Sequence, residues 1–478
     1  MGKGSLVSSH AISNGKFDLF RLISPGAAMR RSPAVLAAVP SGAAAALFVV
    51  ATASVPTVLV VSVFVACVSC WLMEQVAGLN LQRLTIASFW YWLYLAFVFI
   101  PAFFVFSSHS EPYRTTYMAA VDSALITVPL GVMAVNVTTG FHQESVRKYF
   151  CAPLARDGSA NRLLTGFLIL LGVALVLTLL YVLEVRSLPL FYLVFHPGAY
   201  DELVLLREES LKLLTSDLRY AYYVLRSTLY PLLILVAFGR YLGTRGALWR
   251  NLFVLTLAIG LVYSALSIAK SPVTNLVLML ALFWYLKKGG KLSLKSGAIA
   301  VTLFLVFPVF VVVLEQPDLV NVGGALNVIG ERLFRLPAEI LYYYFQVFPG
   351  VAPFQHGATI GLLATVVGMT PFDDANFVGR YMYAHGMPSV TANAPFLGSL
   401  YADFGFPGVL AGGFLAGLLM QAAQLRIVRD PKRTVHLALY AFLLVTFAYL
   451  NTTSLPIVLM SDGVLFAFLF VWVIRAAD

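Results

Sequence analysis

Apolar segments of about twenty residues follow one another along almost the whole chain, from Ala34 to Ile474. A helix of that length crosses the roughly 30 Å hydrocarbon core of a bilayer. Lipid offers no partner to backbone N–H and C=O groups, so such segments span as helices. Charged residues make up only 11% of the chain, against about 25% in soluble domains. The sequence therefore predicts an all-α, polytopic membrane protein.

Twelve segments are long and apolar enough to be spans, at 33–51, 54–74, 86–106, 116–138, 163–185, 221–243, 252–269, 272–286, 296–315, 404–425, 435–451 and 455–475. If the N-terminus is inside, most of the lysines and arginines fall in the inside loops. Basic loops stay in the cytoplasm, so we expect both termini to be cytoplasmic. The formal charge of +10 then follows from topology and argues against nucleic-acid binding.

One long polar segment interrupts the apolar pattern. Three parts are therefore predicted. Residues 1–315 form an N-terminal bundle of nine spans with a smaller external loop at 186–220, residues 316–403 form a large external loop of amphipathic helices, and residues 404–478 form C-terminal membrane helices. The leucine spacing in the second half of the smaller loop predicts an amphipathic helix on the membrane surface. In the large loop, Pro337 lacks an N–H and should kink or divide the helix around it.

Missing motifs narrow the possible chemistry. The chain contains no G-x-x-x-x-G-K-[ST], H-E-x-x-H or G-x-S-x-G sequence, which argues against ATP hydrolysis, zinc proteolysis and serine-hydrolase chemistry. Cys67 and Cys70 form a C-x-x-C inside an apolar span, where cysteine behaves as a small hydrophobic residue. The sequence predicts no disulfide, no metal site and no cofactor.

Apart from the basic inside loops, a few basic residues lie near the outer membrane surface in the predicted topology. Guanidinium groups carry forked donors that bind phosphate and pyrophosphate bidentately. We therefore expect a site for a phosphorylated substrate, with the cationic candidates Arg226, Lys270, Arg332, Arg335 and Arg380.

Tyrosines flank these arginines on the large loop. Tyr342 and Tyr343 combine an apolar ring with a hydroxyl group, which suits the C–H faces and hydroxyl edges of sugars. A structural alternative remains open, because Glu331, Arg335 and Glu339 at four-residue spacing could simply pair on a solvated helix.

Several short motifs succeed one another in the second half of the chain: Ala269-Lys270-Ser271-Pro272, Glu331-Arg332-Leu333-Phe334-Arg335-Leu336-Pro337-Ala338, Phe354-x-His356-Gly357, Asn393-Ala394-Pro395-Phe396 and Asp403-Phe404-Gly405-Phe406-Pro407-Gly408. In this succession the chain resembles the oligosaccharide repeat-unit (O-antigen, Wzy-type) polymerases of the bacterial inner membrane. The likeness extends from about residue 220 to the end of the chain, and hydropathy carries as much of it as residue identity.

The resemblance implies a GT-C-like integral membrane glycosyltransferase that works on the periplasmic face without nucleotide or metal. Its donor and its acceptor would both be polyprenyl-pyrophosphate-linked oligosaccharides, and a chain-length regulator protein would be a further partner beside the lipid bilayer. The arginines would stabilise the departing pyrophosphate, and Asn393 joins the implied substrate-binding set.

The acceptor hydroxyl needs a base, and four titratable residues lie on the predicted external side: His356, Asp374, His385 and Asp403. His356 is the first choice, because the glycine after it permits close approach. Structural roles remain open for two of them, since Asp403 could cap the following span and His356 could be a satisfied structural histidine.

Other functions compete with polymerisation. A lipid-linked glycan transferase or ligase would use the same chemistry, and twelve spans are common in transporters such as a lipid-linked oligosaccharide flippase. Transporters usually show internal repeats and charges near the bilayer midplane. Here the halves differ and the charges concentrate outside the spans, with Asp122 and Asp462 as exceptions. A non-enzymatic assembly subunit is the remaining alternative.

Overall fold

The computed structural model describes residues 57–75, 83–109, 112–155, 160–185, 216–265, 270–290, 294–315, 321–383 and 391–476, together with residues 189, 192, 195, 196 and 206. The first predicted span, most of the predicted amphipathic helix in the smaller loop, and His385 lie outside these residues. Every regular element in the described part is helical, which confirms the all-α prediction there.

The first half of the chain contributes α3 (Thr57–Gln75), α4 (Ile86–Tyr94), η1 (Leu95–Phe99), α5 (Ile100–Ser108), α6 (Tyr113–Thr139), α7 (Gln143–Cys151), α8 (Ala160–Glu184), α11 (Ser216–Val224), η2 (Leu225–Leu229) and α12 (Tyr230–Thr244). The second half contributes α13 (Ala247–Ala265), α14 (Lys270–Lys287), α15 (Leu294–Glu315), α16 (Val322–Gly330), η3 (Glu331–Arg335), α17 (Leu336–Val347), α18 (Gly361–Val367), α19 (Asp374–Met382), α20 (Phe396–Val428), α21 (Thr434–Ala448), η4 (Tyr449–Asn451), α22 (Leu455–Leu459) and α23 (Val464–Ala476).

Within the described residues, 8 helical segments are long and apolar enough to cross a membrane: Ile86–Ser108, Tyr113–Thr139, Asn161–Glu184, Leu218–Thr244, Ala247–Ser264, Phe396–Val428, Thr434–Asn451 and Leu455–Ile474. Shorter apolar helices at Thr57–Met73, Ser271–Lys287 and Val301–Leu314 coincide with further predicted spans. The structure thus agrees with a polytopic membrane protein. α20 begins at Phe396, inside the range predicted for the large loop, and kinks at Gly405, where φ is 63°.

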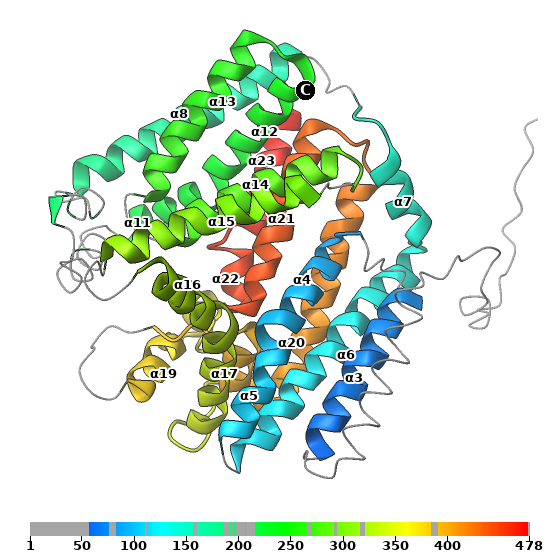
Figure 1. Ribbon diagram of the computed structural model, residues 1–478, viewed down its shortest axis with the longest axis vertical. Helices are drawn as coiled ribbons and strands as arrows, with labels where there is room; N and C mark the ends of the chain where they lie inside the picture. Colours follow the sequence, from blue (N-terminus) through cyan, green and yellow to red (C-terminus); the bar gives the residue numbers. More distant parts are fainter. Residues whose placement is uncertain are drawn as a thin grey trace, which may run out of the picture.

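α6 and α20 pack along each other more extensively than any other pair of described helices, and they run side by side in Figure 1. A Cβ atom on Gly131 would lie 2.1 Å from the carbonyl oxygen of Phe414, and one on Gly417 would lie 2.0 Å from that of Val128. Lipid tails give no hydrophobic drive for helix association, so close backbone packing at small residues stabilises such pairs.

The loops predicted to be cytoplasmic contact one another at one end of the bundle. The Arg83 guanidinium donates to the carbonyl oxygen of Arg147 at 3.4 Å, and Lys432 Nζ donates to that of Phe150 at 3.0 Å. A Cβ atom on Gly290 would lie 3.0 Å from the Phe150 ring. Loops that are far apart in sequence therefore meet here, and we call this region the basic end.

α16, α17 and α19 lie together at the other end of the helices (Figure 1). α17 packs against α5, α6 and α20, and its Tyr344 and Phe345 are almost fully buried. The turn after α17 approaches the start of α6, where a Cβ atom on Gly350 would lie 3.4 Å from the Tyr113 hydroxyl. We call this region the site end.

The described residues contain π-helical turns at η1, η2 and η3, and each is followed at once by a proline in the second position of the next helix: Pro101, Pro231 and Pro337. A proline ring clashes with the carbonyl group four residues earlier and leaves it without a donor. In all three cases that carbonyl belongs to the middle residue of the π-helical turn. The wider π-helical turn accommodates the proline ring. The break predicted at Pro337 therefore takes the form of a π-helical turn.

Candidate functional site

The first cavity of the site end lies beside η3 and α17 and has a volume of about 510 Å³. We call it the η3 cavity. Its polar lining comes from Glu331, Arg332, Arg335, Glu339, Tyr383 and Thr391. The π-helical turn supplies both arginines, so two of the predicted phosphate-binding residues share one cavity.

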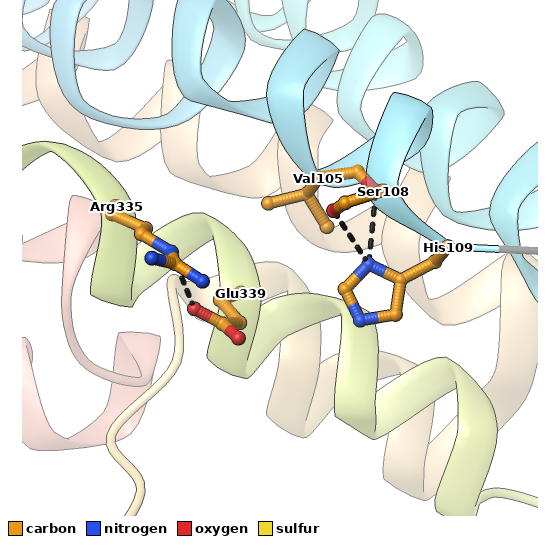
Figure 2. Close-up of polar contacts among 5 residues, drawn as sticks. All are labelled: Val105, Ser108, His109, Arg335 and Glu339. Atoms are coloured by element: carbon orange, nitrogen blue, oxygen red, sulfur yellow. Dashed lines mark hydrogen bonds and ion pairs between the residues drawn. The ribbon is translucent and has the colours of Figure 1, made fainter.

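Arg335 and Glu339 form an ion pair with a distance of 3.1 Å between Nε and Oε2 (Figure 2). This ion pair is one of those expected if Glu331, Arg335 and Glu339 simply pair on a solvated helix. However, the Arg335 side chain is 67% exposed, and exposed helix pairs of this kind contribute only about 0.3–0.5 kcal/mol. Arg332 is also exposed and forms no ion pair with any described residue. The cavity therefore keeps donors for an anionic ligand.

Tyr342 does not face this cavity. Its side chain is only 3% exposed, and its ring packs at 4.1 Å from the ring of His109, measured between centroids. Figure 2 shows His109 at the end of α5, where Nδ1 lies 3.1 Å from Ser108 Oγ and 3.0 Å from the carbonyl oxygen of Val105. These contacts favour a packing role for Tyr342 over the predicted contact with sugar.

Two further predicted residues, Tyr343 on α17 and Arg380 on α19, do not line the η3 cavity. Tyr343 is partly buried, and this burial together with the charge of Glu339 raises the pKa of its phenol. Arg380 is exposed in the last turn of α19. Their predicted roles in substrate binding remain predictions.

A second cavity of about 490 Å³ lies beside η2, and we call it the η2 cavity. Arg226 lines it, with its guanidinium group 5.1 Å from the ring centroid of Tyr222 and 5.3 Å from that of Tyr223. Arg226 Nη1 also donates to the Tyr222 hydroxyl at 3.3 Å. Stacking on two rings holds the planar group in one orientation. Asp462 lines the same cavity, close enough for the opposite charges to attract.

The turn that carries Asp462 is clamped against η2. Ser227 Oγ donates to the carbonyl oxygen of Ser461 at 3.0 Å, and Thr228 Oγ1 donates to that of Asp462 at 3.3 Å. Gly463 has φ of 87°, and a Cβ atom there would lie 1.7 Å from Thr228 Oγ1. A glycine is therefore required at this position, and the contact fixes where the Asp462 carboxylate can lie.

Further polar groups of the η2 cavity come from α14, from η4, which carries Tyr449, and from the segment before α20. Asn275 on α14 donates through Nδ2 to the Tyr449 hydroxyl, and Asn393 extends from the segment before α20. Lys270 is the first residue of α14, next to Ser271 in the cavity lining, but its side chain lies outside the described part. Arg226 and Asn393, which are far apart in sequence, are thus brought together.

The two cavities adjoin through one short segment, residues 391–393, which we call the partition. Thr391 and Ala392 line the η3 cavity, whereas Asn393 lines the η2 cavity. The partition is held at Ala392, whose N–H donates to the carbonyl oxygen of Ala375 at 2.8 Å. The Ala392 carbonyl oxygen accepts a hydrogen bond from the Tyr344 hydroxyl at 3.4 Å.

Asp374 supports the partition through Tyr344. Its Oδ2 accepts hydrogen bonds from Ser399 Oγ at 2.6 Å and from the Tyr344 hydroxyl at 3.1 Å. Burial raises the pKa of Asp374, and these two hydrogen bonds oppose that shift. Burial and the nearby carboxylate also raise the pKa of Tyr344, so the phenol stays protonated as a donor. These contacts favour a positioning role for Asp374, and its predicted role as a base stays a prediction.

Asp403 lies in α20, and His356 lies in the loop that packs against this part of the helix. Asp403 Oδ1 accepts from the N–H groups of Gly357 at 3.0 Å and Thr359 at 3.2 Å, and Oδ2 accepts from Thr359 Oγ1 at 2.5 Å. The His356 side chain is exposed, and its backbone has a left-handed φ of 53°. Neither residue lines the η2 or η3 cavity. These contacts tie the loop to α20, and they are not the cap of the following span that the sequence suggested for Asp403, because α20 already begins at Phe396.

The carboxylates that do line the cavities include Glu339 and Asp462. Sequence reasoning interpreted Glu339 only as an ion-pair partner, and it gave Asp462 no role beyond that of an intramembrane carboxylate. The sequence signal for Glu339 was its position four residues after Arg335, and the signal for Asp462 was a carboxylate within an apolar segment. Only the fold shows that each lines a cavity. Among the described residues, no group of three His, Cys, Asp or Glu side chains is arranged to hold a metal.

Comparisons of the chain with family models, with curated proteins and with solved structures found no match. The function must therefore be inferred from what the two adjoining cavities can bind.

Proposed function

We propose that the protein polymerises polyprenyl-pyrophosphate-linked oligosaccharide repeat units, as an integral membrane glycosyltransferase at the periplasmic face of the bacterial inner membrane. The observation that carries this proposal is the pair of adjoining cavities at the site end, each with arginine on a π-helical turn. Polymerisation joins two large anionic lipid-linked substrates, so both must be held at once with their reacting ends together. The basic loops at the opposite end support a cytoplasmic location for that end and for both termini.

In the reaction, the acceptor hydroxyl oxygen forms a bond with the anomeric carbon of the donor. The bond from that carbon to the donor pyrophosphate breaks, and the pyrophosphate leaves with the bonding electrons. Arg332 and Arg335 in the η3 cavity offer forked donors to this developing negative charge. Fixed donors beside low-dielectric lipid stabilise such charge better than water does, because they need no reorganisation.

The acceptor sugar occupies the η2 cavity in this proposal. Asp462 takes the proton of the attacking hydroxyl, and Asn393 offers an amide to the sugar at the boundary between the cavities. Arg226, stacked on two tyrosine rings, orients the Asp462 carboxylate by electrostatic attraction. We prefer Asp462 to His356, the base predicted first, because Asp462 lines a cavity with Arg226, whereas His356 lines neither cavity.

The glycan ladder of a strain that lacks the gene tests this function. We expect the loss of long chains with single repeat units retained on their final carrier. Loss of every capped glycan would instead indicate a ligase, and cytoplasmic accumulation of the lipid-linked unit would indicate a flippase. An unchanged ladder would exclude all three functions, leaving no glycan step for the protein.

A pair of matched variants tests the proposed base. Asp462→Asn should leave a stable protein that forms no long chains. Asp122→Asn is the control, because Asp122 is also an intramembrane carboxylate but accepts a hydrogen bond from Ser62 Oγ on α3 at 2.6 Å and lines neither cavity. It should retain the ladder. A full ladder from Asp462→Asn would remove Asp462 from the mechanism.

A further inference from the structure

The basic end contains a cavity of its own, which is separate from the proposed site. It lies between the adjoining ends of α12, α13 and α14 and has a volume of about 570 Å³. Its lining includes four cationic side chains and two aromatic side chains, from Arg245, Arg250, Lys287, Lys288, Tyr241 and Trp284. No carboxylate is among the residues that line it.

None of the four basic side chains in this cavity forms an ion pair with a described acidic residue. Arg245 and Lys287 are close enough for their like charges to repel, and neither forms an ion pair with a described residue. Such repulsion raises the energy of the folded protein unless an anion lies between the charges. Lys288 Nζ is already placed, 4.8 Å from the ring centroid of Trp284. The cavity is therefore arranged for an anion.

Basic residues at the ends of membrane helices are common and normally extend into water. Here they line a hollow instead, and Tyr241 and Trp284 line it with them. Tyrosine and tryptophan favour the depth of lipid headgroups. Basic cavities between membrane helices, on the side that carries the basic loops, suit phosphate-bearing headgroups.

We propose that this cavity binds the phosphodiester headgroup of an anionic phospholipid. Arg245 and Lys287 contact the phosphate oxygens, and Tyr241 and Trp284 lie beside the glycerol and the upper acyl chain. The proposal does not depend on the function of the site end, since the two regions share no lining residue.

The test is the thermal unfolding of the full chain in nanodiscs of phosphatidylcholine alone or with phosphatidylglycerol added. Phosphatidylglycerol should raise the unfolding midpoint of the wild type by a few degrees, because a ligand that binds only the folded state stabilises it. The double variant Arg245→Gln/Lys287→Gln should lose this rise. The matched control Lys148→Gln/Arg429→Gln removes the same charge from exposed residues of the basic end that lie outside the cavity, and it should keep the rise.

An equal loss in both double variants would overturn the proposal, since the effect would then be one of general surface charge. Inorganic phosphate added to phosphatidylcholine nanodiscs distinguishes a soluble ligand from a lipid, and a full rise with phosphate alone would contradict the lipid assignment. If the Arg245→Gln/Lys287→Gln variant does not fold, Lys288→Gln provides the same comparison at an exposed side chain. An unreduced rise in that variant would also count against the proposal.

Discussion

The Tyr344 hydroxyl lies 3.1 Å from Asp374 Oδ2 and joins the last turn of α17 to the first turn of α19. The same hydroxyl is 3.4 Å from the carbonyl oxygen of Ala392 in the partition. One buried phenol thus connects a carboxylate to the segment that separates the two cavities. The position of the partition depends on this connection, which leads to the first two predictions.

Tyr344→Phe should destabilise the protein by about 1–3 kcal/mol, because it removes a hydrogen bond to a partly buried carboxylate. It should also reduce polymerisation, since the partition loses its contact with α17. The measurements are the unfolding midpoint in detergent and the length of the glycan ladder. Tyr343→Phe is the matched control for the unfolding midpoint, because Tyr343 lies one position away and its hydroxyl has no described hydrogen bond. Equal shifts of the midpoint in the two variants would contradict this role for Tyr344.

The pH dependence of stability should report Asp374. Burial raises the pKa of Asp374 above its ordinary value, so the folded state binds more protons than the unfolded state between the two pKa values. Its contribution to stability is therefore present at low pH and is lost as pH rises through the folded-state pKa. Asp374→Asn removes this dependence. The midpoint of the variant relative to the wild type should be highest near pH 8 and fall as the pH approaches 4. Parallel curves for the two proteins would contradict the shift.

Much of the fold follows from local sequence. Every predicted span after the first coincides with an apolar helix, because length and hydropathy alone decide whether a segment can cross a bilayer. The break expected at Pro337 occurs, because the proline ring clashes with the carbonyl group four residues earlier. Its form as a π-helical turn was not predicted, although Pro101 and Pro231 carry the same signal.

Variants of Arg335 and Glu339 distinguish a substrate-binding role of Arg335 from a role in the ion pair alone. Arg335→Lys keeps the charge but loses the fork, so it should cost about 1–3 kcal/mol of transition-state stabilisation, or roughly 5- to 150-fold in rate. The measurement is the polymerisation rate at equal protein level. Glu339→Gln removes only the ion-pair partner of Arg335 and is the comparison. If Arg335 serves only that pair, both variants should keep nearly full activity.

The orientation of the bundle can be checked with native and introduced cysteines. Cys151 is exposed at the basic end, so it should react with a membrane-impermeant maleimide only after spheroplasts are opened. Asp373→Cys in a Cys151→Ser background should react in intact spheroplasts, because Asp373 is exposed at the site end. The reverse pattern of labelling would put the site end in the cytoplasm and contradict the proposed periplasmic reaction.

The composition of the site could be predicted only in part. Arg332 and Arg335 share a cavity because they share one helical turn, which sequence spacing reveals. The meeting of Arg226 with Asn393 and Asp462 depends on the packing of η2 against the turn before α23, over distances in sequence that no local pattern reports. Asp403 was expected as a base because it is titratable, whereas its three hydrogen bonds to one loop are set by tertiary contacts.

The most direct test is the reaction of the purified protein in lipid vesicles that contain only lipid-linked repeat units. We expect products with two or more repeats on one lipid, with one polyprenyl pyrophosphate released for each linkage formed. Arg335→Lys and Asp462→Asn should slow both processes together. If the repeat units remain single while they move from one leaflet to the other, the protein is a transporter and the proposed glycosyl transfer is wrong.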